Sequence, residues 1–325
     1  MIITKIPFRI PLGGGGTDLP SYYSQFGGSL VTASINKYMY VSVNEPKTSD
    51  EIKVYYKFTE TVNHTWEINH DIIRECLKLH NIDRPIEIGS MADIEAQTGM
   101  GSSSVFTVGL LLALNTLLKK PVSALDLAEQ ACDVEIYRVG KPIGKQDQYA
   151  ASVGGINHLE INRFGNVIVL PLNLTEDTIF DLESRLMMFY TGQTRDANAI
   201  LGSQGKEIKG NKTEFMHRIK EIGEKSKEAL LNSNIDLFGR LLHEHWMTKK
   251  QFSNMSSELI DDWYQVALIN GALGGKIMGA GGGGFILICA GREARKDIKT
   301  ALVNRGLRYM DFRFEFSGAK VITNI

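Results

Sequence analysis

The chain has 325 residues, 43% hydrophobic and 22% charged, which is enough for two domains and a sizeable buried core. The formal net charge is −1 and no basic tract stands out, which argues against nucleic acid as the main partner. Cys76, Cys132 and Cys289 are far apart, so neither a disulfide framework nor a CxxC metal site is expected, and a reducing cytoplasm fits.

In chain order, residues 2–12 alternate well enough to predict a strand, and no signal peptide is expected from this segment. Later strands are predicted where β-branched and aromatic residues gather, and helices where apolar residues recur at helical spacing. The further predicted strands are 29–44, 51–58, 85–91, 156–161, 166–172, 185–190, 285–290 and 309–317. The predicted helices are 69–80, 105–118, 124–138, 195–207, 213–232, 235–250, 256–273 and 293–305.

Four consecutive glycines, residues 13–16, follow the first strand directly, and Thr17 and Asp18 come next. Such a run gives the chain flexibility or lets the backbone approach a ligand closely. Because the run is short and begins where the strand ends, close approach is the favoured interpretation. Asp18 would then supply a specific polar contact.

A second glycine turn at residues 97–104 (QTGMGSSS) precedes a strongly apolar predicted helix. The glycines permit a tight turn, and the three serines offer hydroxyl and N–H groups where the helix starts. A helix N-terminus suits an anion such as phosphate, whereas the alternative is a serine-capped loop before a buried helix. Residues 96–118 carry no formal charge, but their polar side chains favour a buried helix over a membrane span.

Two carboxylates between the second and third glycine turns are candidate site residues, Glu135 and Asp147. Glu135 falls on or beside the apolar stripe of the helix at 124–138, so it needs a salt bridge to a buried arginine or a bound metal ion. Asp147 ends the glycine- and proline-punctuated loop 140–148. It either caps the following helix or is held in a site.

The third glycine turn, residues 279–284, formally satisfies GxGxxG, but it lies before a strand rather than after one, so a Rossmann site is not supported. The chain also lacks a P-loop, the protein-kinase motifs and a GxSxG elbow. His243 and His245 do not form an HExxH zinc site, and both are expected on the surface or in a groove.

The three glycine-rich turns, in this order, resemble the motifs of the GHMP kinase superfamily. The first motif is residues 7–18 (PFRIPLGGGGTD), the second is residues 99–104 (GMGSSS) and the third is residues 276–284 (KIMGAGGGG). The resemblance implies an α+β fold with a ribosomal-S5-like N-terminal domain and a ferredoxin-like C-terminal domain. We place the domains at 1–180 and 181–325, with the active site between them.

The resemblance implies ATP and Mg²⁺ as cofactors. The residues that would wrap the ATP phosphates are Gly99, Met100, Gly101, Ser102, Ser103 and Ser104. Ser103 and Glu135 match the family's two Mg²⁺ ligands. Two protein ligands are enough for Mg²⁺, because this ion prefers hard oxygen donors and keeps several waters.

On the acceptor side, Asp147 matches the family's catalytic aspartate and Arg9 the basic residue that pairs with it. Asp147 would remove the proton of the acceptor hydroxyl or only orient that hydroxyl. The residues expected to contact the substrate are Gly15, Gly16, Thr17, Asp18, Arg195, Gly281 and Gly282. Arg195 is the first choice for a substrate phosphate, with Lys249 or Lys250 as weaker choices, although Arg195 could be an ordinary surface residue.

Within the superfamily, the stretches GGGTD, GKQDQYA and YTGQTRDA are similar to the D-glycero-D-manno-heptose 7-phosphate kinases. This similarity implies phosphorylation of an anomeric hydroxyl on the way to nucleotide-activated heptose for surface polysaccharides. A small-molecule sugar phosphate and ATP are the expected partners, with no membrane and with a homodimer possible. The rival interpretations are a kinase for fucose or another hexose, and a non-catalytic homologue that binds a sugar or nucleotide.

Overall fold

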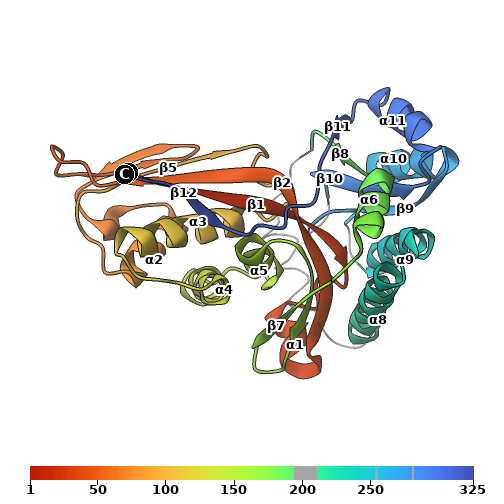
Figure 1. Cartoon of the computed structure of the whole chain (residues 1–325), viewed down its shortest axis with the longest axis horizontal. Coiled ribbons are helices and arrows are strands. Elements are labelled where there is room, and N and C mark those ends of the chain that lie inside the picture. The colour runs from red at the N-terminus through yellow and green to blue at the C-terminus, as the bar shows by residue number, and fades with distance from the viewer. Residues whose placement is uncertain (194–210, 253–254, 280–281) are drawn as a thin grey trace.

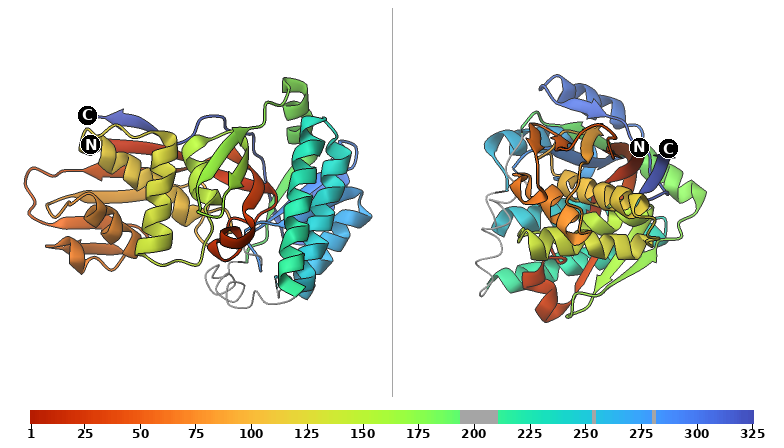
Figure 2. Two further views of the ribbon diagram at one scale, coloured as in Figure 1. Left: turned by 90° about the horizontal axis from the view of Figure 1, so that it is seen from below. Right: turned by 90° about the vertical axis from the view of Figure 1, so that its left-hand side faces the viewer.

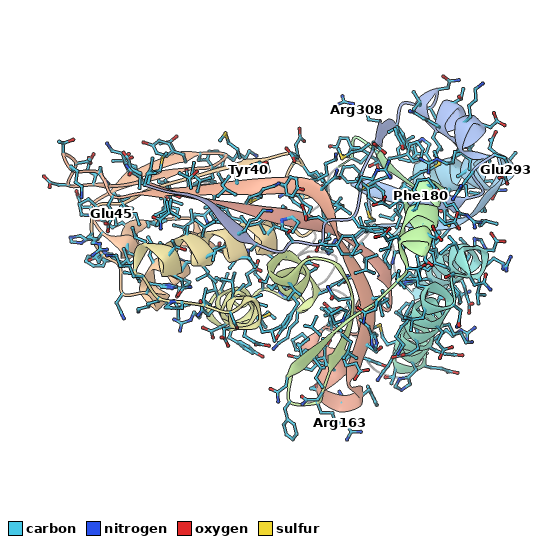
Figure 3. All side chains as sticks on the ribbon, in the orientation of Figure 1. Tyr40, Glu45, Arg163, Phe180, Glu293 and Arg308 are labelled. Atoms are coloured by element: carbon cyan, nitrogen blue, oxygen red, sulfur yellow. The ribbon has the colours of Figure 1, made fainter. Side chains whose placement is uncertain are left out.

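The computed structural model describes residues 1–193, 211–252, 255–279 and 282–325. It has an α+β architecture in which two sheets lie along the long axis of the molecule, each covered by helices (Figure 1). Exposed charged side chains such as Arg163, Glu293 and Arg308 project from its outer rim (Figure 3). The predicted helix at 195–207 lies outside the described residues.

Within the described residues, the first sheet has eight strands in the order β12-β1-β2-β5-β3-β4, and β6 and β7 extend it from β2. The long strand β2 pairs with β6 along its first part and with β5 along its last part. The strands are β1 (Ile2–Gly13), β2 (Gly28–Asn44), β3 (Ile52–Tyr55), β4 (Thr59–Val62), β5 (Glu87–Ala92), β6 (Ile156–Ile161), β7 (Val167–Pro171) and β12 (Lys320–Asn324).

Helix α3 (Ser102–Leu117) packs on β1 and β2 and is buried along most of its length. Gly109 permits this close packing, because a Cβ atom there would lie 2.4 Å from Cδ1 of Ile6. The Thr4 hydroxyl donates to the Gly109 carbonyl at 3.0 Å. The other helices of this half are α1 (Pro20–Phe26), η1 (Thr65–Glu67), α2 (Asp71–Leu79), α4 (Ala124–Cys132), the π-helix η2 (Asp133–Arg138) and α5 (Gln146–Val153).

The second sheet has the order β11-β8-β10-β9, and Trp246, Trp263 and Phe189 belong to its core. Its strands are β8 (Leu186–Tyr190), β9 (Ala272–Ile277), β10 (Phe285–Ala290) and β11 (Arg308–Met310). Its helices are α6 (Glu176–Arg185), α8 (Asn211–Leu231), α9 (Ile235–Phe252), α10 (Glu258–Ile269) and α11 (Arg295–Val303). Across the described helices, none has both the length and the apolar character that a bilayer span requires.

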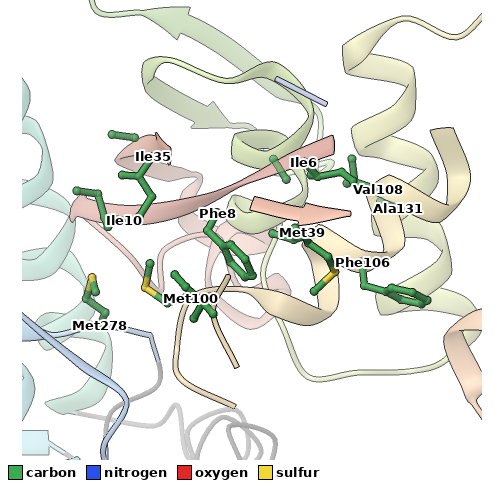
Figure 4. Close-up of a cluster of buried hydrophobic side chains, with 14 of the residues drawn as sticks. Ile6, Phe8, Ile10, Ile35, Met39, Met100, Phe106, Val108, Ala131 and Met278 are labelled. Carbon is green, nitrogen blue, oxygen red and sulfur yellow. The ribbon is translucent and has the colours of Figure 1, made fainter. Parts of the chain in front are cut away.

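Close glycine contacts join the two halves. Helix α8 packs on β1 and β2, and a Cβ atom at Gly223 of this helix would lie 2.8 Å from Cα of Gly14. Met100 and Met278, from the second and third glycine motifs, belong to the same hydrophobic cluster as Phe8 and Ile10 (Figure 4). The three glycine motifs are therefore packed against one another through a shared core.

Three sequence predictions need correction. The predicted helix at 256–273 ends at Ile269, because Gly271 takes a φ of 96° and the chain enters β9. The predicted strand at 309–317 is instead the short strand β11, followed by β12, which returns to pair with β1 and brings the two termini together (Figure 2). The predicted helix at 124–138 changes to π-helical winding at Asp133.

The proposed domain boundary near residue 180 falls within α6, which leads from the first sheet to β8.

Candidate active site

A cleft of about 620 Å³ lies where the two halves meet. The first half lines it with part of the first glycine run (Gly15 and Gly16), with Gly99 and residues 101–104 of the second motif, and with most of the segment 141–147. The second half lines it with Lys249, Met255, Lys276 and Gly279. Segments from all three glycine motifs therefore face a single cavity.

The second motif approaches its neighbours so closely that two positions require glycine. Gly99 and Gly101 have φ angles of 77° and 76°, which place both in the left-handed region. A Cβ atom at Gly101 would lie 2.6 Å from Oδ2 of Asp147, and one at Gly99 would lie 2.5 Å from the Met278 carbonyl oxygen. Met100 points into the core instead of the cleft.

Helix α3 begins immediately after Gly101, and no side chain caps its N-terminus. The first N–H groups of a helix have no partner within the helix, and they carry a partial positive charge. Ser102, Ser103 and Ser104 form this first turn and line the cleft. The turn is thus suited to bind the phosphates of a nucleotide.

Glu135 is completely buried beside this turn. The Ser103 hydroxyl donates to Oε1 of Glu135 at 2.5 Å, and Nε2 of Gln148 donates to Oε2 at 2.8 Å. Lys141 donates to Oγ of Ser103 at 2.9 Å, and its Nζ is 3.9 Å from Oε1 of Glu135. The cation beside Glu135 is therefore a lysine and not the buried arginine considered from sequence.

The π-helix η2 carries Glu135 into this position. Burial raises the pKa of Glu135, and the nearby Lys141 ammonium opposes that rise. A carboxylate and a hydroxyl in direct contact are the hard oxygen donors that Mg²⁺ prefers. The Ser103–Glu135 pair fits a Mg²⁺ site, with the ion's other positions left for water and nucleotide oxygens.

Arg9 and Asp147 form a two-point ion pair at the centre of the cleft. Nε and Nη2 of Arg9 donate to Oδ1 and Oδ2 of Asp147 at 2.6 and 2.7 Å. Nη1 donates to the Gly99 carbonyl at 2.9 Å, which ties the pair to the second motif. Asp147 lies in the first turn of α5 and is not its N-cap, which is Lys145.

Asp18 occupies the neighbouring wall. Its Oδ1 accepts from the Gly16 N–H at 2.9 Å, and its Oδ2 accepts from the Gln146 N–H at 3.1 Å. Burial raises the pKa of Asp18, and the negative charge of Asp147 adds to that rise, while these backbone hydrogen bonds oppose it. Thr17 does not line the cleft, because its buried hydroxyl bonds the Gly14 and Ser29 carbonyls.

The third motif supports the second one. A Cβ atom at Gly279 would lie 2.6 Å from Cα of Gly99, and one at Gly284 would lie 2.1 Å from the Thr98 carbonyl oxygen. Gly282 does not line the cleft; its N–H donates to the Met255 carbonyl at 2.8 Å. Arg195 and Gly281, both predicted substrate contacts, lie outside the described residues.

Comparison with known proteins identifies the family. Residues 63–155 match the profile of the GHMP kinases N terminal domain, and residues 226–307 match that of the GHMP kinases C terminal domain. Together the two matches span more than half of the chain. The chain belongs to the GHMP kinase family. It is accordingly an ATP-dependent kinase, as its sequence motifs imply.

Individual relatives of this GHMP kinase match along its whole length. It is 29% identical to the D-glycero-alpha-D-manno-heptose 7-phosphate kinase of Campylobacter jejuni over 98% of both chains. The crystal structure of a D-glycero-D-manno-heptose 1-phosphate kinase from Bacteroides thetaiotaomicron covers 100% of both chains, with a TM-score of 0.83 and 26% identity. Galactokinase of Lactococcus lactis, at 17% identity and a TM-score of 0.76, shares the fold over 98% of this chain and 95% of its own.

Several residues in or beside the cleft of this GHMP kinase were not predicted from the sequence. Lys141, which bonds Ser103, lies in the loop before α5, and Gln148, which bonds Glu135, lies in the first turn of α5; only Asp147 was singled out in this stretch. Tyr56 and His70 also line the cleft, with their rings edge to face at 4.7 Å. Lys141 could have been found from its position in the sequence between Glu135 and Asp147. No sequence pattern marked Tyr56 and His70.

The predicted exposure of His245, in the second half of the chain, was wrong. This residue was expected on the surface or in a groove, but it is completely buried. Burial and the positive charges of Lys276 and Lys249 hold its pKa well below the usual value. His243 is half-buried, and its Nδ1 lies 2.8 Å from the Tyr264 hydroxyl.

Proposed function

We propose that this kinase transfers the γ-phosphoryl group of ATP to the anomeric hydroxyl of D-glycero-D-manno-heptose 7-phosphate, giving the 1,7-bisphosphate and ADP. The observation that carries the proposal is the single cleft that holds the α3 N-terminus, the Ser103–Glu135 pair and the Arg9–Asp147 ion pair. The near full-length similarity to a heptose 7-phosphate kinase supports the substrate. The product would supply the synthesis of nucleotide-activated heptose.

The residues have separate tasks in this reaction. The N–H groups at the start of α3 bind the ATP phosphates, and Ser103 and Glu135 hold Mg²⁺. When bound, Mg²⁺ neutralises charge on the phosphates. Phosphoryl transfer depends mainly on positioning and charge neutralisation, so most of the contribution of the protein is to hold donor and acceptor in line.

Asp147 lies where it can accept the hydrogen of the acceptor hydroxyl, and Arg9 fixes the orientation of its carboxylate through two hydrogen bonds. Asp18 is held by two backbone N–H groups and can accept hydrogen bonds from sugar hydroxyls with its remaining lone pairs. The aromatic end of the cleft, at Tyr56 and His70, offers a surface for the nucleobase.

ADP release with a panel of sugars tests the substrate. The panel contains heptose 7-phosphate, heptose 1-phosphate, unphosphorylated heptose, mannose, fucose and galactose, each with ATP and Mg²⁺. Selective turnover of heptose 7-phosphate is the expected result. Turnover of an unphosphorylated sugar alone would keep the kinase and overturn its substrate, and turnover of the 1-phosphate would move the reaction to another hydroxyl. Tight ligand binding without any turnover would indicate a non-catalytic homologue.

A further inference from the structure

Lys276 is a buried cation that the catalytic scheme above does not use. It lies in β9 with 3% of its surface exposed, and it lines the cleft. No hydrogen bond or ion pair joins its side chain to any residue that the structure describes. A buried ammonium group without a counter-charge is unfavourable, because it loses hydration without gaining a partner.

The charges that face Lys276 are of its own sign. Burial, Lys249 and Arg9, in that order, hold its pKa well below the usual value, and no carboxylate counteracts them. The buried His245 lies in the same positive field. Two carboxylates that line the cleft act on other cations: Asp147 is paired with Arg9, and Asp18 acts on Lys249.

Lys249 strengthens the same field from α9. It is half-buried, and burial together with the charge of Arg9 lowers its pKa to about 8, against the opposing effect of Asp18. Two lysines from the second half of the chain therefore line the same cleft as Arg9 from the first half and add to its positive field. A dianionic group that entered this field would supply a counter-charge to Lys276 and connect the two halves.

The position of these lysines identifies the anion. At the α3 end of the cleft, the cation beside Ser103 and Glu135 is Lys141, which suits the phosphates of the donor. The charge of Arg9 acts instead on both Lys249 and Lys276, and that of Asp18 acts on Lys249, which associates the two lysines with the acceptor side of the cleft. We propose that Lys276, with Lys249 beside it, binds the phosphate group that the acceptor already carries. This assignment rests on the proposed function, because it requires a phosphorylated sugar as acceptor.

Steady-state kinetics of Lys276→Met test the proposal. Methionine keeps the length of the side chain and removes its charge. We expect KM for heptose 7-phosphate to rise about 30-fold or more, the usual consequence of removing one partner of a buried charge pair. KM for ATP and turnover of unphosphorylated heptose should change less than about threefold, since neither needs this charge.

The matched control is Lys250→Met. Lys250 is the next residue on α9 after Lys249, but it pairs with Asp261 at 2.5 Å and does not line the cleft. This control should leave every KM unchanged. The Tm of ligand-free Lys276→Met should equal or exceed that of the wild type, because a methionine avoids burying an uncompensated charge. If Lys276→Met loses its preference for heptose 7-phosphate over unphosphorylated heptose while its Tm is unchanged, the loss is due to weaker binding and not to misfolding.

The outcomes separate this inference from the proposed function. If the wild type prefers heptose 7-phosphate and Lys276→Met keeps that preference, the subsite is wrong and the function stands. If KM for ATP rises instead, Lys276 serves the donor phosphates. If the wild type itself does not distinguish phosphorylated from unphosphorylated heptose, the proposed substrate fails, and the acceptor-phosphate subsite fails with it.

A measurement on the wild type alone adds a second readout. A bound dianion raises the pKa of Lys276 back toward its ordinary value, so across a pH series the complex should take up a proton where the pH lies between the free and the bound pKa. Calorimetric titration with heptose 7-phosphate in two buffers of different ionisation enthalpy measures this proton directly. Uptake that Lys276→Met abolishes supports the subsite, and binding without proton uptake contradicts it.

Discussion

Three of the carboxylates that line or adjoin the cleft, Asp147, Asp18 and Glu135, have different partners. Asp147 is paired with the guanidinium of Arg9, Asp18 accepts two backbone N–H groups, and Glu135 contacts a hydroxyl, an amide and a more distant lysine. Only Glu135 is fully buried. These environments suit three different tasks, namely orienting the acceptor hydroxyl, binding sugar hydroxyls and holding a metal ion.

Asp147→Asn tests the first of these tasks. Asparagine has nearly the same shape but cannot accept a proton, so we expect kcat to fall about 100-fold or more while ATP binding stays within a factor of about three. Stopped-flow or coupled measurement of kcat, with calorimetry for ATP, checks both parts. Unchanged kcat would show that Asp147 neither removes the proton nor orients the hydroxyl.

Glu135→Gln tests the metal ligand. The variant keeps the hydrogen-bonding shape but removes the negative charge that attracts Mg²⁺. Mutation of a residue that hydrogen-bonds a metal ligand lowers metal affinity about 10–100-fold, and mutation of the ligand itself should cost at least as much. The Mg²⁺ concentration for half-maximal nucleotide binding should therefore rise at least about tenfold. A Mg²⁺ titration followed by nucleotide fluorescence measures it. An unaltered titration midpoint would exclude Glu135 as a ligand.

At the scale of elements, the glycine turns act as contact points between backbone segments. Gly101 touches the Asp147 carboxylate, Gly99 touches Gly279, and Gly14 touches Gly223 of α8. Each contact leaves no room for a Cβ atom. The second motif thereby holds the start of α3 against the Arg9–Asp147 pair on one side and against the third motif on the other.

Gly101→Ala should therefore lower kcat by more than the backbone strain of an alanine at this φ angle would cause by itself. The added Cβ would meet Oδ2 of Asp147 at 2.6 Å and displace that carboxylate. Gly140→Ala is the matched control, because Gly140 has a similar φ of 79° but nothing within 4 Å of its Cβ position. We expect kcat to fall at least about tenfold for Gly101→Ala. Equal kcat values in the two variants would contradict the role of this contact.

The sequence predicted those helices and strands whose apolar residues recur at a regular spacing or whose ends are marked by glycine or proline. The strands at 29–44, 156–161 and 166–172 were predicted because β-branched residues mark them. The strand β9 was not predicted, because its first residues, 272–275 (ALGG), resemble a continuation of the preceding helix. Its pairing with β10 depends on the tertiary structure. The π-helical turn at Asp133 has no local sequence signal either.

At the scale of the whole molecule, the cleft needs both halves of the chain. The glycine motifs predicted the residues around the α3 N-terminus because backbone geometry demands glycine there. Lys276 and His245 were not recognised as cleft or core residues, since only the three-dimensional packing of β9 and α9 places them inside. Buried charge without a local partner is a property of the assembled molecule, which explains why sequence pattern did not reveal it.

We propose that this cleft phosphorylates the anomeric hydroxyl of a heptose 7-phosphate. ³¹P NMR of the wild-type enzyme with ATP, Mg²⁺ and heptose 7-phosphate tests this reaction directly. We expect ADP and a second sugar phosphorus resonance, coupled to the anomeric proton, that grows in step with ADP. Growth of a resonance coupled to any other sugar proton, or no new sugar phosphate while another sugar is consumed, would contradict it.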